Sequence, residues 1–221
     1  MSGDHLPGRE PAATTEATYP ALPLFPLRSV LFPAGLLALK VFEARYLDLI
    51  TDCLRRHRPF GVVCLLQGGE VREGKGAAVR FESAGVLARL DEVDGEQPGL
   101  LRVRCTGTQR FRLEDGAAQQ PDGLWVGRAQ LLPDDAAALP APSQLPAVQA
   151  LASAIGKLKA QGAEPFLPPY RLDDAGWVAN RWCEILPIPL GAKQKLMELE
   201  DPQLRLQLVQ DYLQGQGVIS G

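Results

Sequence analysis

The first chemistry to consider from the sequence is nucleotide binding by a phosphate-binding loop. Gly69, Gly74 and Lys75 have the spacing GxxxxGK, in which backbone amides and the lysine hold nucleotide phosphates. The motif also requires Ser or Thr after the lysine, because that hydroxyl holds magnesium, and here the residue is Gly76. The following VRFESAGVL predicts a strand, whereas such a loop leads into a helix. The pattern favours a glycine-rich hairpin and predicts no ATP binding or hydrolysis.

Nucleophilic catalysis has one candidate pair, Ser153 and Lys157, which lie four residues apart and therefore share one face of a predicted helix. A lysine beside a serine could activate the hydroxyl, but nothing nearby in the sequence offers an oxyanion hole. The two histidines, His5 and His57, are not placed beside a cysteine, and no GxSxG elbow occurs. The sequence therefore predicts that the chain is not an enzyme and has no catalytic residue.

Metal and cofactor binding lack suitable ligands. The acidic residues occur as chain neighbours in turns, such as Asp134–Asp135, where carboxylates cap helices or are solvated. The four cysteines are scattered without a CxxC pair, which favours buried, reduced thiols over a zinc site. We expect no metal and no cofactor.

Charge and composition describe an ordinary globular protein. The 221 residues include 23 basic and 26 acidic residues, a net charge of −3, which disfavours nucleic acid or an anionic membrane as the partner. Arg102, Arg104, Arg110 and Arg112 form a basic stripe without interleaved aromatics, so a wet strand face is favoured over a single-strand binding surface. The sequence shows no secretory signal and no membrane-spanning run, which indicates a cytoplasmic protein.

The elements that position these residues change in character along the chain. Leu101, Val103 and Cys105 alternate with arginines, the period-2 pattern of a strand with one wet face. Similar short runs extend to about residue 132, with one helix after Glu43, and beyond residue 142 the apolar period becomes helical. The predicted organisation is a flexible leader at 1–20, a β-rich domain at 21–132, a linker at 133–142, a helical subdomain at 143–214 and a tail at 215–221.

Several residues are expected to begin the helices. Ser143 is a candidate cap for the first helix after the linker, in which Gly156 is a weak point. Asp173 or Asp174 is expected to cap the next helix, and Asp201, followed by Pro202, the last one. The β-rich and helical parts are expected to form separate cores.

Three stretches together resemble the N-terminal, substrate-recognising domain of Lon proteases. They are LPLFPLRSVLFPAGLLALKVFEARYLDLITDCL (22–54), LLRVRCTGTQRFRL (100–113) and WVANRWCEILPIPLGAKQKLMELEDPQLRLQLVQDYL (177–213). The resemblance implies the α+β class, with a PUA-like β pseudo-barrel containing one helix, followed by a helical subdomain. It also implies a non-catalytic module that binds unfolded polypeptide or a protein partner, as a stand-alone protein without the ATPase and protease domains of Lon.

The segment EPFLPPY offers the best candidate for partner contact. Phe166, Leu167 and Tyr170 are large apolar residues on a proline-stiffened segment, which could present them in a groove between the two parts. Packing of the same loop over the junction is an equally open alternative. For Glu43, Arg45 and Tyr46 the simplest interpretation is a cap, an ion pair and a core anchor.

Two functions from different classes remain at this stage. The leading interpretation is a polypeptide-binding module; the alternative is a PUA-like protein that binds a small molecule or RNA. A strongly basic face on the barrel would favour the alternative, whereas an uncharged apolar groove would favour polypeptide binding.

Overall fold

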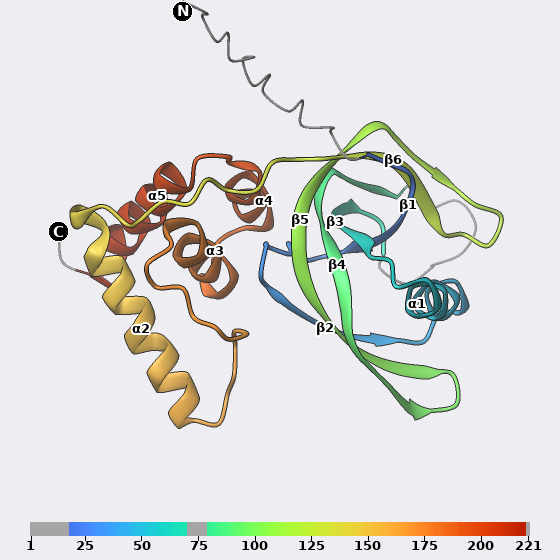
Figure 1. Cartoon of the computed structure of the whole chain (residues 1–221), viewed down its shortest axis with the longest axis horizontal. Helices are drawn as coiled ribbons and strands as arrows, with labels where there is room; N and C mark the ends of the chain where they lie inside the picture. Colours follow the sequence, from blue (N-terminus) through green and yellow to red (C-terminus); the bar gives the residue numbers. More distant parts are fainter. Residues whose placement is uncertain (1–17, 70–78, 220–221) are drawn as a thin grey trace, which may run out of the picture.

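A computed structural model describes residues 18–69 and 79–219 (Figure 1). The N-terminal half is made of strands with one helix among them: β1 (Thr18–Leu27), β2 (Leu36–Val41), α1 (Ala44–Arg56), β3 (Phe60–Gln67), β4 (Arg80–Gln97), β5 (Leu100–Gln119) and β6 (Trp125–Leu131). The C-terminal half is helical: a short 3₁₀ turn (Pro142–Gln144), α2 (Leu145–Ala160), α3 (Ala175–Ile185), α4 (Leu190–Glu198) and α5 (Pro202–Gly215). Gly74, Lys75 and Gly76 of the GxxxxGK pattern lie outside the described residues.

The strands form a sheet that closes on itself. Its order is β2-β5-β4-β3-β1-β6, and β6 also pairs with β5, so β5, β4, β3, β1 and β6 close into a ring to which β2 is attached through β5. β1 and β3 run parallel, and the other pairs are antiparallel. The long β5 pairs with β2 along its first part and with β6 along its last, because its course bends between the two. The strand half is therefore a pseudo-barrel, with β2 as a terminal strand of the order.

The barrel interior follows from side-chain alternation. On β5, Val103 and Cys105 are buried while Arg102 and Arg104 are exposed, which confirms the predicted period-2 pattern. One side of the barrel encloses a small apolar cluster: Leu22, Leu24, Val63, Leu87, Phe111, Leu113 and Ala129. α1 packs its apolar side inward, where Tyr46 stacks on Phe25 with ring centroids 3.9 Å apart.

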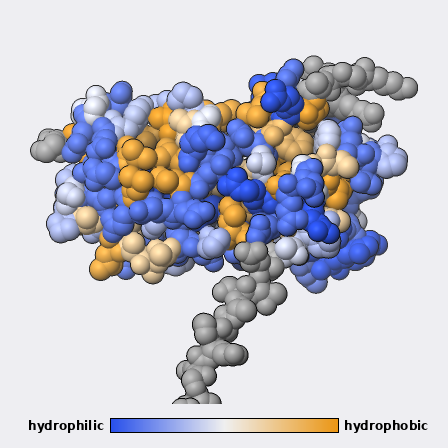
Figure 2. Space-filling model, turned by 90° about the horizontal axis from the view of Figure 1, so that it is seen from above, coloured by the Kyte–Doolittle hydropathy of each residue, from blue (hydrophilic) through white to orange (hydrophobic). Residues whose placement is uncertain are grey.

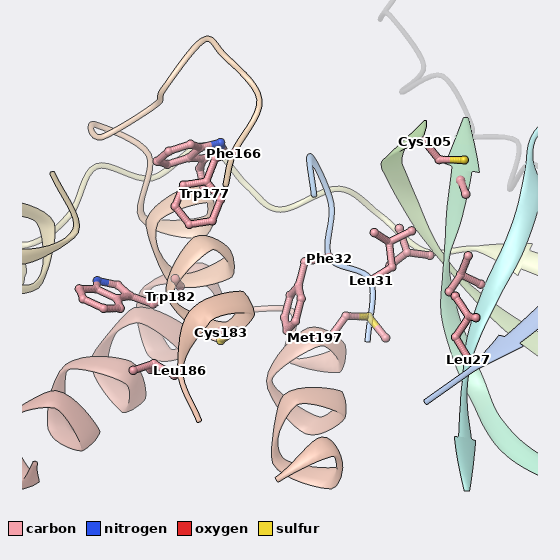
Figure 3. Close-up of a cluster of buried hydrophobic side chains, with 14 of the residues drawn as sticks. Leu27, Leu31, Phe32, Cys105, Phe166, Trp177, Trp182, Cys183, Leu186 and Met197 are labelled. Carbon is pink, nitrogen blue, oxygen red and sulfur yellow. The ribbon is translucent and has the colours of Figure 1, made fainter. Parts of the chain in front are cut away.

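The two halves share one continuous core, so the expectation of separate cores was wrong. Leu31 and Phe32, in the segment between β1 and β2, are buried in the same cluster as Met197 of α4 and Trp182 of α3. Figure 3 shows Leu31, Phe32 and Met197 lying between the helices and the strands. Because Pro33 and Gly35 turn the chain here, the preceding apolar pair extends out of the barrel and packs against the helices.

The ends of the elements follow local rules in most places. Asp174 accepts a hydrogen bond from the amide of Trp177, and Asp201 accepts from two amides at the start of α5. Ser143 lies instead in the 3₁₀ turn, and Gln144 precedes α2. β1 begins at Thr18, before the expected end of the leader at residue 20, because Thr18 and Tyr19 pair with β6. In the described part of the chain, no helix is long and apolar enough to cross a membrane.

Candidate functional site

A cleft of about 900 Å³ opens between the barrel and the helical half. The barrel contributes the turn at Pro33 and Ala34, the end of α1, and residues of β4 and β5. The linker contributes Asp134 and Asp135, and the helical half contributes residues around α3. Its walls mix apolar and polar groups, among them Tyr19, Leu54, Leu90, Leu131, Trp177, Thr106, Thr108 and Gln109. A cleft of this size and position is typical of ligand sites at domain junctions.

The arginines that line the cleft lie beside carboxylates. Each arginine that lines it has a carboxylate partner: Arg58 with Asp52, Arg89 with Asp91, Arg110 with Asp135 and Arg171 with Asp174. Two further arginines of the basic stripe, Arg104 and Arg112, lie 3.6 and 3.9 Å from Glu92 and Glu198. Among the described residues, Asp52 is shared by Arg55, Arg56 and Arg58 at the end of α1, whereas the other arginines of the cleft lie beside carboxylates farther along the chain.

Asp135 fixes the linker to both halves of the molecule. Its carboxylate lies 2.8 Å from Arg110 of β5 and 2.6 Å from Arg205 of α5. These arginines are 3% and 1% exposed, and Arg205 also donates to Asn180 of α3. Burial lowers the pKa of the Arg110 guanidinium, and the negative charge of Asp135 acts in the opposite direction. The sequence treated Asp134–Asp135 as a solvated or capping pair; for Asp135 this was wrong.

A second arginine joins α3 to the turn between β1 and β2. Arg181 is completely buried and donates hydrogen bonds to the carbonyls of Pro33, at 2.8 Å, and Ala34. It also pairs with Glu184 at 2.9 Å. Gly35 has no side chain, and a Cβ there would collide with the carboxylate of Glu184. The small residues of this turn therefore make room for the ion pair beneath it.

The proline-rich loop lies at the junction, with its residues in different settings. Phe166 is 2% exposed and packs edge-to-face on Trp177 at 6.2 Å, and the Arg181 guanidinium lies 5.6 Å from its ring (Figure 3). Leu167 and Tyr170 are half-buried. Phe166 therefore packs in the core, and contact of Phe166, Leu167 and Tyr170 with a partner stays a prediction.

The other sequence candidates lie apart from this site or at its rim. Ser153 and Lys157 are exposed on α2, without the buried donors that catalysis would require. His57 lies at the rim of the cleft, in the left-handed conformation that ends α1. Among residues 18–69 and 79–219, no three His, Cys, Asp or Glu side chains are grouped as metal ligands. Arg45 pairs with Glu43 at 2.9 Å, although Glu43 makes no side-chain cap, and Tyr46 is the predicted core anchor.

Most of the residues that line the cleft could not be identified from the sequence. Thr106, Thr108 and Gln109 are ordinary polar residues of β5, and no local pattern distinguishes them.

The cysteine that lines the cleft is a weak candidate for chemistry. Burial raises the pKa of the Cys53 thiol to about 11. A thiol that stays protonated is a poor nucleophile.

Comparisons with known proteins agree on one family. Residues 21–215 match the model of the ATP-dependent protease La (LON) substrate-binding domain. The chain is 28% identical over 217 residues to a Lon protease of Paraburkholderia phytofirmans and 30% identical over 203 residues to Lon protease 2 of Myxococcus xanthus. These matches cover 93% and 87% of this chain but 26% and 23% of the relatives, so the chain spans about a quarter of their length.

Solved structures show the same similarity in three dimensions. A Lon N-terminal domain protein from Xanthomonas campestris is 31% identical, with a TM-score of 0.65 over 88% of this chain and 99% of the other. The N-terminal domain of a Mycobacterium avium complex Lon protease shares the fold at 16% identity, with a TM-score of 0.59 over 87% of this chain and 97% of the other. The α+β, PUA-like architecture implied by the sequence is thereby confirmed, and the chain belongs to the Lon substrate-binding domain family.

Proposed function

We propose that this chain is a non-catalytic module that binds unfolded or extended segments of polypeptide, with the cleft between its two halves as the main contact surface. The observation that carries the proposal is an open cleft of about 900 Å³ with both apolar and polar lining residues, in a chain that matches a substrate-binding domain. An unfolded chain offers apolar side chains and backbone amides together. A cleft lined by Leu54, Leu90 and Trp177 beside hydroxyl and amide side chains complements both.

The fixed junction supports this assignment. Because Asp135 and Arg181 tie the helical half to the barrel through buried hydrogen bonds, the cleft walls keep their separation without a ligand. A preformed groove of mixed polarity suits weak, sequence-tolerant binding, with an affinity on the order of micromolar. The proposal excludes catalysis by Ser153 and Lys157, which lie exposed on α2.

A pair of exposed leucines provides the test. Leu54 lines the cleft and is 45% exposed, whereas Leu66 at the end of β3 is 51% exposed and lines neither this cleft nor the smaller hollow near β2. Leu54→Asp should weaken binding of a fluorescent, reduced and carboxymethylated protein at least about tenfold, because a carboxylate replaces an apolar contact in the groove. Leu66→Asp should bind as the unmodified chain does.

Fluorescence anisotropy measures the affinity, and thermal unfolding of each variant checks that the fold persists. The proposal fails if the unmodified chain does not bind the unfolded protein. If both leucine variants bind equally well, the cleft is not the binding surface. Cleavage of the bound protein that stops with Ser153→Ala would overturn the non-catalytic assignment.

A further inference from the structure

The terminal strand β2 lies beside a second, smaller hollow at the junction. This hollow has a volume of about 340 Å³ and is lined by Val30, Leu31, Leu36, Leu37, Phe166 and Ile185, with Glu184 and Lys193 at its wall. Successive strand residues point to opposite faces of a sheet, so a hollow that touches both Leu36 and Leu37 lies at the end or edge of the strand. Figure 1 shows the start of β2 close to the loop between α2 and α3.

Within the described residues, 18–69 and 79–219, β2 has a hydrogen-bonding partner strand on one side only. It pairs with β5 from Leu36 to Val41 and is the last strand in the sheet order. Alternate residues of such a strand direct their amides and carbonyls away from the sheet, which makes the edge a template for another extended chain. Ala38 and Lys40, in the middle of this strand, are exposed.

On the exposed face of this sheet, the charge changes sign from β4 to β5 but stays positive from β5 to β2. In register, Lys40 of β2 lies opposite Arg102 of β5, and Arg102 lies opposite Asp94 of β4. One pair along, Arg104 lies between Ala38 and Glu92. The rows therefore run from acidic on β4 to basic on β5 and basic again on β2. In the described part of the chain no carboxylate lies within ion-pair distance of Lys40.

We propose that β2 accepts an extended segment of a partner polypeptide as an additional strand, with an acidic residue opposite Lys40 and a large apolar side chain in the hollow beside Leu36. Leu36 and Lys40 are separated by an even number of positions and lie on one face, so the acidic and apolar residues of the partner are four positions apart. The inference rests on the proposed function and gives it a ligand pattern and a second contact.

The same charges disfavour a second copy of this chain as the occupant. Pairing of two β2 edges would bring the Lys40 side chains of both copies onto one face, and like charges on neighbouring strands repel. A lysine on an edge strand is a known protection against self-pairing. The edge is thus closed to its own copy and open to an acidic strand.

Labelled peptides of about nine residues test the pattern on the full chain. The probe alternates threonine with aspartate, valine and leucine, with aspartate and leucine four positions apart; a second probe has lysine in place of aspartate. The unmodified chain should bind the aspartate probe about three- to tenfold more tightly, the range for a cross-strand charge pair and its reversal. Lys40→Glu should invert this preference, and Ile185→Asp should weaken both probes equally by removing the apolar contact.

Two further measurements separate this inference from its alternatives. A probe N-methylated at the valine amide and the adjoining threonine amides should lose binding, because strand pairing needs those N–H groups. Equal preferences of the unmodified chain and Lys40→Glu, or full binding of the N-methylated probe, would overturn the inference. So would self-association through this edge in sedimentation. If Leu54→Asp still weakens binding of the unfolded protein in those cases, the proposed function stands without strand addition at β2.

Discussion

Replacing Asp135 by asparagine should destabilise the whole fold, because two buried arginines then lose their only shared carboxylate. Arg110 and Arg205 are 3% and 1% exposed, and Asp135 lies within 2.8 Å of both. Removing one member of a buried ion pair costs about 3–5 kcal/mol. We expect the lower end, about 3 kcal/mol, because the Asp135 side chain is 18% exposed and both arginines keep hydrogen bonds to carbonyls.

Urea unfolding followed by circular dichroism measures this loss. With a slope of about 3 kcal/mol per molar urea for a chain of this size, the midpoint should fall by about 1 M. The melting temperature should fall by about 6–12 °C. Asp134→Asn is the matched control: Asp134 is the neighbouring residue, also lines the cleft and is exposed, so its change should stay within about 0.5 kcal/mol. Equal losses in the two variants would refute the argument that Asp135 joins the halves.

Two more predictions follow from the junction and from α2. Burial raises the pKa of Glu184 from its ordinary 4.5 to about 7. Between these two pH values the folded chain therefore holds a proton on Glu184 that the unfolded chain lacks. Because of this difference, the free energy of unfolding falls as pH rises through this range. Glu184→Gln should lack that part of the decline between pH 5 and pH 8 in urea titrations; parallel pH profiles would contradict this. Gly107→Ala should lower the melting temperature by several degrees, because its Cβ would collide with the Phe32 carbonyl, whereas Gly156→Ala, in open space on α2, should stabilise by about 1 kcal/mol. A higher melting temperature for Gly107→Ala than for Gly156→Ala in calorimetry would contradict this prediction.

The parts of the fold that were predictable depend on short-range rules. Alternation along β5 is decided by neighbouring residues, and Asp174 and Asp201 cap their helices through amides two or three residues away. The family resemblance supplied the order of the two halves, which those local rules do not contain. Two expected caps differ from this: the chain enters α2 through a 3₁₀ turn that contains Ser143, and Glu43 pairs with Arg45 without capping α1.

The site was much less predictable, because its contacts join distant parts of the chain. Asp135 reaches a residue 70 positions away, and Arg181 reaches carbonyls about 147 positions away. From sequence, Asp135 looks like any acidic residue in a loop, since burial of its partners is decided by tertiary packing. For Phe166 the sequence left packing and partner contact both open, and only the tertiary structure shows its contacts with Trp177 and Arg181.

The turn between β1 and β2 connects stability with the proposed binding. Its carbonyls receive Arg181, and its backbone also pairs with β5, where Gly107 exchanges hydrogen bonds of 2.8 Å with Ala34 and Gly35. Pro33 and Ala34 of the same turn line the large cleft, and Leu31 and Leu36 beside it line the small hollow. Two binding surfaces thus share one rigid support. A ligand would meet walls that are already in place, so less of its interaction energy is consumed in ordering the protein. Substitutions that loosen this turn should therefore weaken binding at both surfaces together, whereas changes at Leu54 or Lys40 should act on one.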